Sequence, residues 1–177
     1  MDKKQFEIKL KQCVISVFND IENKDDLFEF GIFTDQDTSS ITICYNTYSH
    51  FLDSFKKNFL EKGEIITRFR WSIPEWCREI GGENFMIDSI NDILYDVIQP
   101  QESELYPDSF KDNILDLLCS VLINIKEEGL FSDMKENFIL YVEQADSWID
   151  DLMKQRIRKL VGERYYEEFL YDMKNEL

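Results

Sequence analysis

Three carboxylates in the last third of the chain have the residue types and spacing of a metal site. Glu143 closes an apolar run, and Asp146 and Asp150 follow it closely. Carboxylate oxygens are the ligands that Mg²⁺ and Ca²⁺ prefer, and a bound divalent cation can activate water for hydrolysis. A carboxylate-dependent metal-binding hydrolase is therefore one hypothesis. Helix capping and solvation by the same side chains is the alternative explanation, and no metal is required for it.

The segment that begins Asp35-x-Asp37-x-Ser39 starts like a calcium-binding loop. Such a loop needs glycine at its sixth position and glutamate at its twelfth, but this chain has Ser40 and Asn46 there. Short polar side chains bond their own backbone in turns. We therefore interpret the segment as a turn.

Other patterns that would indicate a catalytic or cofactor site are missing from the sequence. The single histidine, His50, lies in a predicted helix, and no HExxH, P-loop or GxGxxG motif is present. The cysteines are widely spaced within apolar segments and form no CxxC pair, so we expect reduced core thiols. They are Cys13, Cys44, Cys77 and Cys119. The sequence thus predicts no catalytic residue and no cofactor.

The elements that would position any site are organised around a predicted hairpin over residues 27–45. Apolar residues alternate along both of its runs, which is typical of strands with a buried face. They are Phe28, Phe30, Ile32, Ile41, Ile43 and Tyr45. Leu27 and Phe33 make the opposite face of the first strand partly apolar, so both faces could be covered. Gly31 lies inside that strand, where glycine often marks a bulge or the close approach of another backbone.

Apolar residues spaced three and four apart predict helices around this hairpin. The expected helices span residues 3–22, 47–62, 73–80, 83–98, 108–128, 146–160 and 163–175. A short strand is expected at 64–70, and residues 138–143 are apolar on both faces, which is typical of a central strand. We predict one α+β domain over residues 1–177. It would have a small, mainly antiparallel sheet, made of the hairpin 27–45 and strand 138–143, flanked by about six to seven helices.

Size and composition favour a soluble protein of the cytoplasm. A chain of 177 residues with 44% hydrophobic residues can form a substantial core and is not disordered. No apolar run approaches the roughly 20 residues that span a bilayer. The N-terminal residues lack the apolar core of a signal peptide.

Charge is the clearest compositional signal. The chain has 36 acidic and 20 basic residues, for a net charge of −16, and residues 99–151 hold 13 acidic residues against three lysines. Such a field repels nucleic acid and anionic membranes and attracts basic partners. The candidate protein-binding residues are Asp108, Asp112, Asp116, Glu127 and Glu128, with Trp148 as an anchor.

The tract Arg70-Trp71-Ser72-Ile73-Pro74-Glu75-Trp76 carries a family resemblance, together with Phe33-Thr34-Asp35 and the later segment 146–151. With these tracts the chain resembles, over nearly its whole length, the bacterial domain-of-unknown-function 4303 family. The family pattern is Arg-Trp-Ser-Pro-Ala-Glu-Trp, and the proline here is displaced by one position. The resemblance implies a bacterial source and supplies no catalytic residues. Small acidic members of the family look similar to the immunity proteins of bacterial toxin systems.

The leading hypothesis is a non-enzymatic, intracellular protein that binds a basic partner protein, with toxin neutralisation as its biological role. The hydrolase with Glu143, Asp146 and Asp150 is the alternative. A third hypothesis is a scaffold whose acidity serves only solubility. The charge pattern and the lack of a catalytic constellation favour the first.

Overall fold

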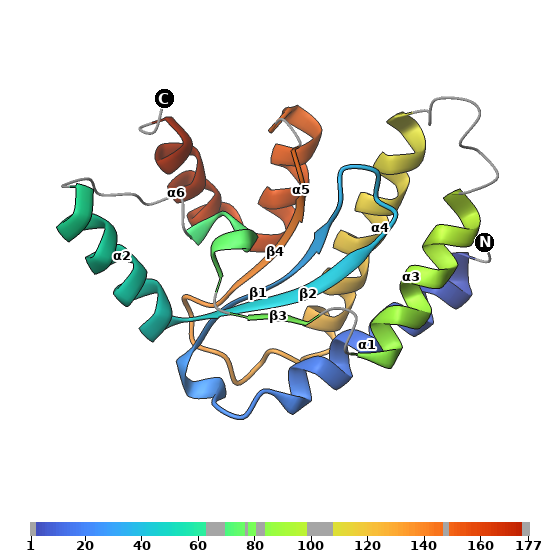
Figure 1. The fold of residues 1–177 in the computed structure, drawn as a ribbon, viewed down its shortest axis with the longest axis horizontal. Helices are drawn as coiled ribbons and strands as arrows, with labels where there is room; N and C mark the ends of the chain where they lie inside the picture. The colour runs from blue at the N-terminus through green and yellow to red at the C-terminus, as the bar shows by residue number, and fades with distance from the viewer. Residues whose placement is uncertain are drawn as a thin grey trace.

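The computed structural model describes residues 3–62, 70–76, 78–80, 84–98, 108–146 and 149–174. Within these residues, six α-helices surround a four-stranded sheet, which confirms the predicted α+β class (Figure 1). In chain order the elements are α1 (Lys3–Asp20), β1 (Leu27–Thr34), β2 (Ile41–Thr47), α2 (Tyr48–Lys62), β3 (Arg78–Ile80), α3 (Phe85–Ile98), α4 (Asp108–Glu127), β4 (Ile139–Gln144), α5 (Asp151–Val161) and α6 (Glu163–Lys174).

The sheet is mixed, with the strand order β3-β2-β1-β4. β2 is antiparallel to both β1 and β3, whereas β4 runs parallel to β1, with Glu29 opposite Ile139 and Thr34 opposite Gln144. The expectation of a mainly antiparallel sheet therefore holds for two of the three pairs. The expectation that residues 138–143 form a central strand was wrong, because β4 is an edge strand among the described residues. Most of its residues are nonetheless buried, because α4 and α5 contact it and the Tyr141 ring lies 6.1 Å from that of Trp71 and 6.5 Å from that of Trp76.

The two faces of β1 meet different partners, as the alternation of side chains along a strand requires. The ring of Phe30 lies 5.8 Å from the rings of both Phe18 in α1 and Phe131 after α4. On the opposite face, Gly31 lies under Ile73 and Trp76. The tract 70–76 therefore covers one face of the sheet, and α1 with the segment after α4 covers the other.

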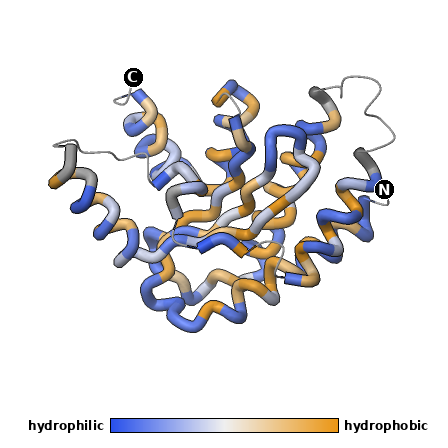
Figure 2. The backbone as a smooth tube through the Cα atoms, in the orientation of Figure 1, coloured by the Kyte–Doolittle hydropathy of each residue, from blue (hydrophilic) through white to orange (hydrophobic). Residues whose placement is uncertain are grey.

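The arrangement of the helices follows their apolar residues. Hydrophobic positions recur on the sides of the helices turned towards the sheet and towards one another (Figure 2). Helices α2 and α6 stand on the same side of the molecule, to the left in Figure 1, whereas α1, α3 and α4 stand to the right. No helix among the described residues has the length and apolar character needed to cross a membrane.

Residues 72–80 differ from the helix that the sequence predicted. In the described part of this stretch, which leaves out residue 77, the helical structure is a 3-10 turn at Ile73–Glu75, and Ser72 makes no side-chain cap. The chain then enters β3, whose Arg78 and Ile80 lie opposite Tyr45 and Ile43 of β2. Hydrogen bonds between β3 and β2 replace the backbone hydrogen bonds that a helix would make. Sequence spacing alone does not reveal that this segment has β2 as its partner.

Two helix starts illustrate how capping decides element boundaries. Thr47 caps α2, because its hydroxyl oxygen accepts a hydrogen bond from the His50 N–H at 3.2 Å. Helix α5 begins at Asp151, later than expected, since its cap is Asp150, which accepts the Met153 N–H at 2.7 Å.

The strand expected at 64–70 lies outside the described residues except for Arg70.

Candidate functional site

A buried polar pair lies on the face of the sheet that the tract 70–76 covers. Glu29 of β1 is opposite Asn46 of β2, and neither side chain reaches solvent. The Asn46 amide donates a hydrogen bond to Glu29 Oε2 at 2.9 Å. Burial raises the pKa of the Glu29 carboxyl to about 8, although the Asn46 hydrogen bond and the charge of Arg70 both lower it. Glu29 is therefore mainly protonated at neutral pH.

Arg70 connects this pair to α6. Its Nε lies 3.7 Å from Glu29 Oε1, and its Nη1 lies 2.6 Å from Glu168 Oε2. Its guanidinium also stands about 5 Å from three ring centroids, an arrangement of the cation–π type. The rings are those of Phe28 at 5.0 Å, Tyr165 at 5.1 Å and Trp71 at 5.2 Å.

A bulge in β1 explains why two consecutive residues reach the same arginine. The register of the β1–β2 pair shifts between Leu27 and Glu29. A bulge re-aims a side chain locally. As a result both Phe28 and Glu29 contact Arg70, although strict alternation would place them on opposite faces.

Four buried polar atoms have no hydrogen-bond partner in the described part of the chain, and three of them belong to the Glu29–Asn46–Arg70 cluster. These three are Glu29 Oε1, Asn46 Oδ1 and Arg70 Nε, and the fourth is Trp76 Nε1. A buried group without a partner costs stability and calls for an explanation, such as a functional role. This cluster is the strongest sign of a functional site in the described structure.

A cleft of about 470 Å³ opens beside Arg70, between α2 and α6. Its described lining residues are Phe51, Arg70, Glu167, Glu168, Tyr171 and Asp172. The indole N–H of Trp71 donates to Asp172 Oδ2 at 2.8 Å, which fixes the carboxylate against the cleft wall. The cleft thus combines two exposed or half-buried aromatic rings with three carboxylates and one guanidinium.

The three metal-site candidates of the sequence serve separate roles. Glu143 is directed inward, accepts the Ile73 N–H at 2.6 Å and has a pKa raised by burial to about 7. Asp150 caps α5, and Asp146 is exposed in a turn with φ of 53°. Among the described residues, no group of three or more His, Cys, Asp or Glu side chains is arranged to hold a metal ion. The geometry therefore gives no support to the hydrolase hypothesis.

The α4 carboxylates proposed as protein-binding residues are partly engaged within the fold. Arg156 of α5, whose side chain is 6% exposed, lies 2.8 Å from both Asp112 Oδ1 and Asp116 Oδ1. Burial lowers the pKa of Arg156, but the two aspartates more than offset it and the pKa is raised. Glu128 pairs with Lys11 of α1.

Two of the proposed contact residues lack a described side chain. Asp108 begins α4, but its side chain lies outside the description, and so does Trp148 as a whole. Glu127 is exposed at the end of α4.

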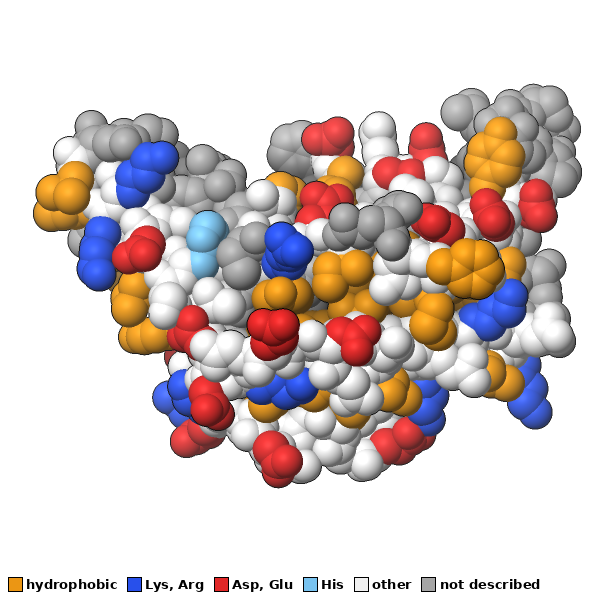
Figure 3. Space-filling view, turned by 60° about the horizontal axis from the view of Figure 1, so that its bottom comes forward, with side chains coloured by type: hydrophobic (Ala, Val, Ile, Leu, Met, Phe, Trp, Pro, Cys, Tyr) orange, Lys and Arg blue, Asp and Glu red, His pale blue; other side chains and the backbone are white. Residues whose placement is uncertain are grey.

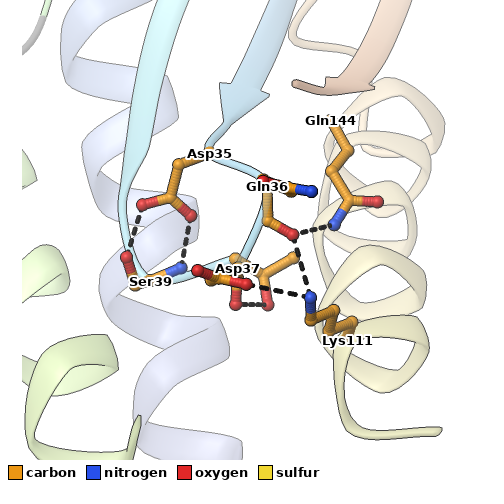
Figure 4. A network of polar contacts seen from close by, with 7 residues as sticks. Asp35, Gln36, Asp37, Ser39, Lys111 and Gln144 are labelled. Carbon is orange, nitrogen blue, oxygen red and sulfur yellow. Dashed lines mark hydrogen bonds and ion pairs between the residues drawn. The ribbon is translucent and has the colours of Figure 1, made fainter. Parts of the chain in front are cut away.

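The segment after β1 forms a turn, as the sequence indicated. Asp35 Oδ1 accepts the Ser39 N–H at 2.7 Å, and its Oδ2 accepts the Ser39 hydroxyl (Figure 4). The same Oδ2 also accepts the Ser40 hydroxyl at 2.8 Å. The Asp35 carboxylate is therefore engaged by its own loop.

Side chains from two other elements attach this loop to the rest of the fold. Lys111 of α4 donates to the Gln36 carbonyl at 3.2 Å and to Asp37 Oδ1 at 3.0 Å. Gln144 of β4 donates to the same Gln36 carbonyl at 2.8 Å (Figure 4). The network holds the end of the β1–β4 pair and the start of α4 together.

The cysteines that the structure describes are buried and free, as expected. Burial raises the pKa of Cys13 to about 11 and that of Cys119 to about 12, and it raises the pKa of Cys44 as well. Cys77 lies outside the described residues. The thiols of the other three are therefore poor nucleophiles in the folded chain.

The sequence interpretation missed the cluster around Arg70. A signal for Glu29 was present, because a charged residue stood between Phe28 and Phe30 in a strand whose two faces could both be covered. No sequence signal indicated that Glu168, nearly one hundred residues after Arg70, would pair with it.

These features define an α+β protein with a mixed sheet, a buried Glu–Asn–Arg cluster on one face and an acidic aromatic cleft beside it. A family model described as Domain of unknown function (DUF4303) matches residues 10–162, and the chain belongs to this family. The matched residues include all four strands and Arg70 and end before α6. The family resemblance of the sequence is thereby confirmed. No curated protein and no solved structure matches the chain.

Proposed function

We propose that the protein is a non-enzymatic, intracellular binding module that captures a basic partner protein, in the manner of an immunity protein that neutralises a toxin. The net charge of −16 supports an electrostatic attraction for cationic partners. Complementary charge mainly raises the association rate and the specificity of a complex. A toxin with a basic substrate groove is the class of partner that fits this field.

The observation that carries the proposal is the placement of Glu127. It is exposed at the C-terminal end of α4, where the helix dipole disfavours negative charge, whereas the neighbouring Glu128 pairs with Lys11. The Glu127 carboxylate therefore works against the stability of the helix. A role in attracting a cationic surface explains why it stands there.

The paired aspartates contribute differently. Spacings of 4 and 11 residues place Asp112, Asp116 and Glu127 along one stripe of α4. Asp112 and Asp116 remain 38% and 57% exposed while they neutralise Arg156. Glu127 is thus the better residue for a test, because changing it leaves the charge of Arg156 compensated.

The test is affinity capture at low salt from a lysate of the organism that carries the gene, repeated at about 0.5 M salt, where screening acts within roughly 5 Å. A captured basic protein is identified and purified, and binding is then measured with both pure components. Glu127→Lys should slow association about fivefold at low salt. Asp92→Lys on α3 is the control, because it makes the same charge change at another exposed carboxylate. Equal association rates for the two variants would contradict the proposal.

A further inference from the structure

The cleft between α2 and α6 has walls of a particular chemistry. Phe51 of α2 packs against Phe28, with ring centroids 5.4 Å apart, so one aromatic wall is anchored to β1. Tyr171 of α6 is 69% exposed at the rim. A volume of about 470 Å³ lies in the range of ligand clefts, which is roughly 300–1,000 Å³.

The charge of the cleft is negative after its internal ion pair is counted. Arg70 is matched by Glu168 at 2.6 Å, which leaves the carboxylates of Glu167 and Asp172 in excess. The Trp71 indole holds Asp172 in place, so this charge has a fixed position. A fixed negative charge beside aromatic rings favours a cation that carries an apolar stem.

We infer that this cleft receives an arginine side chain of the basic partner protein, an inference that rests on the proposed function. Guanidinium is planar, stacks on aromatic rings and binds carboxylates through two parallel hydrogen bonds. Phe51 and Tyr171 supply the rings, and Glu167 and Asp172 supply the carboxylates. A lysine ammonium would use the charge but not the stacking surface.

The experiment is an NMR titration with the peptide acetyl-Gly-Arg-Gly-amide at constant ionic strength. The indole N–H signal of Trp71 reports the site, because that group donates to Asp172. The signal should shift in a saturable manner with the arginine peptide. The same peptide with citrulline in place of arginine keeps the shape and removes the charge, and it should leave the signal in place.

Two variants locate the binding. Glu167→Gln combined with Tyr171→Ala changes exposed residues of the cleft and should weaken the apparent affinity about tenfold. Asp92→Asn on α3 removes one exposed charge outside the cleft and should leave the affinity unchanged. An unshifted Trp71 signal, an equal response to citrulline, or equal affinities of all variants would overturn the inference.

The failure of this inference can be separated from the failure of the proposed function. If an identified basic partner binds the cleft variant as tightly as the original chain, and Glu127→Lys slows its association, the binding function stands and the arginine cleft is refuted. If no basic partner binds and the Trp71 signal does not respond to the peptide, both are refuted.

Discussion

Gly31 and Tyr141 oppose each other in the parallel β1–β4 pair, with no room between them for a side chain. A methyl carbon built on Gly31 would lie 2.5 Å from the Tyr141 carbonyl oxygen and 3.2 Å from side-chain atoms of both Ile73 and Trp76. The absent side chain allows β1 and β4 to pair closely and lets Ile73 and Trp76 pack directly on the face of the sheet. A side chain at residue 31 would therefore disturb both contacts.

The first prediction concerns this contact. Gly31→Ala should lower the free energy of unfolding by about 2–3 kcal/mol, because the nearest obstacle is backbone, which has little freedom to move. Gly129→Ala is the control. Nothing lies within 4 Å of a methyl group there, and only its φ of +91° opposes a side chain, at a cost of about 1 kcal/mol. Urea denaturation measures both, and a smaller loss for Gly31→Ala than for the control would contradict the packing argument.

The second prediction is a pH dependence that arises from Glu29. Its pKa is about 8 in the folded chain, above the ordinary value of 4.5, so the folded state holds a proton that the unfolded state releases between these values. The contribution of Glu29 to stability is complete below pH 4.5 and is lost as pH rises towards 8. Glu29→Gln should remove a slope of at most about 1.4 kcal/mol per pH unit in this window.

Chemical denaturation of both proteins from pH 5 to 9 tests this prediction. The difference in unfolding free energy between Glu29→Gln and the original chain should change in favour of the variant as pH rises. Glu143 shows the same kind of shift, to about 7, and remains in both proteins, so its effect cancels. A difference that is constant with pH would show that Glu29 is ionised in the folded state.

The third prediction compares the loss of stability when the aspartates of the Arg156 ion pairs are neutralised with the loss when Arg156 itself is replaced. Asp112→Asn combined with Asp116→Asn should lower stability by about 1–2 kcal/mol, because it leaves a guanidinium that is 6% exposed without a counter-charge. This figure is reduced for solvent screening, since both aspartates are more than one third exposed. Arg156→Met should cost less, since the released carboxylates can be hydrated. Asp53→Asn, at a pair exposed on both sides, is the control and should have little effect. Thermal unfolding would contradict the prediction if the double variant and the control had equal midpoints.

The fourth prediction concerns the turn after β1. Asp35→Ala removes the acceptor of three hydrogen bonds from Ser39 and Ser40 and should cost about 1–2 kcal/mol. Asp37→Ala removes only an ion pair with Lys111 from a side chain that is 66% exposed, and its effect should be much smaller. Equal losses in a urea titration would show that the Asp35 network does not stabilise the turn.

The hairpin and most helices could be predicted because their signals are local. Alternation marked β1 and β2, and spacing of three and four marked the helices. The turn at Asp35 followed from residue types alone. Gly31 was expected to mark either a bulge or the close approach of another backbone, and the structure shows the second, at the Tyr141 carbonyl.

The rest depended on partners distant in the sequence. β4 was assigned a central place because its residues are apolar on both faces, but an edge strand that is covered by helices and by the tract 70–76 has the same pattern. The cluster of Glu29, Arg70 and Glu168 comes from three separate segments, so no spacing rule applies to it. For the α4 carboxylates, the sequence indicated free negative charges where the structure has ion pairs. The count of charges did not reveal that Arg156 compensates Asp112 and Asp116.

Acidic and basic side chains intermingle on the face that Figure 3 shows, around a band of hydrophobic side chains. Phe59 and Leu60, near the end of α2, are 51% and 83% exposed. This face is therefore less uniformly acidic than the composition implies. Contacts with a partner would have to combine charge with apolar area.

The pairing of β1 with β4 also governs when the sheet can be completed during synthesis. β1 ends at Thr34, whereas its parallel neighbour ends at Gln144 of a chain of 177 residues. While the ribosome adds the intervening residues, the edge of β1 that later pairs with β4 has no partner strand. Pairings between segments so far apart in the sequence form slowly. A nascent chain that stalls before residue 139 would present that edge to other chains, so translation speed over residues 48–138 should influence the yield of folded protein.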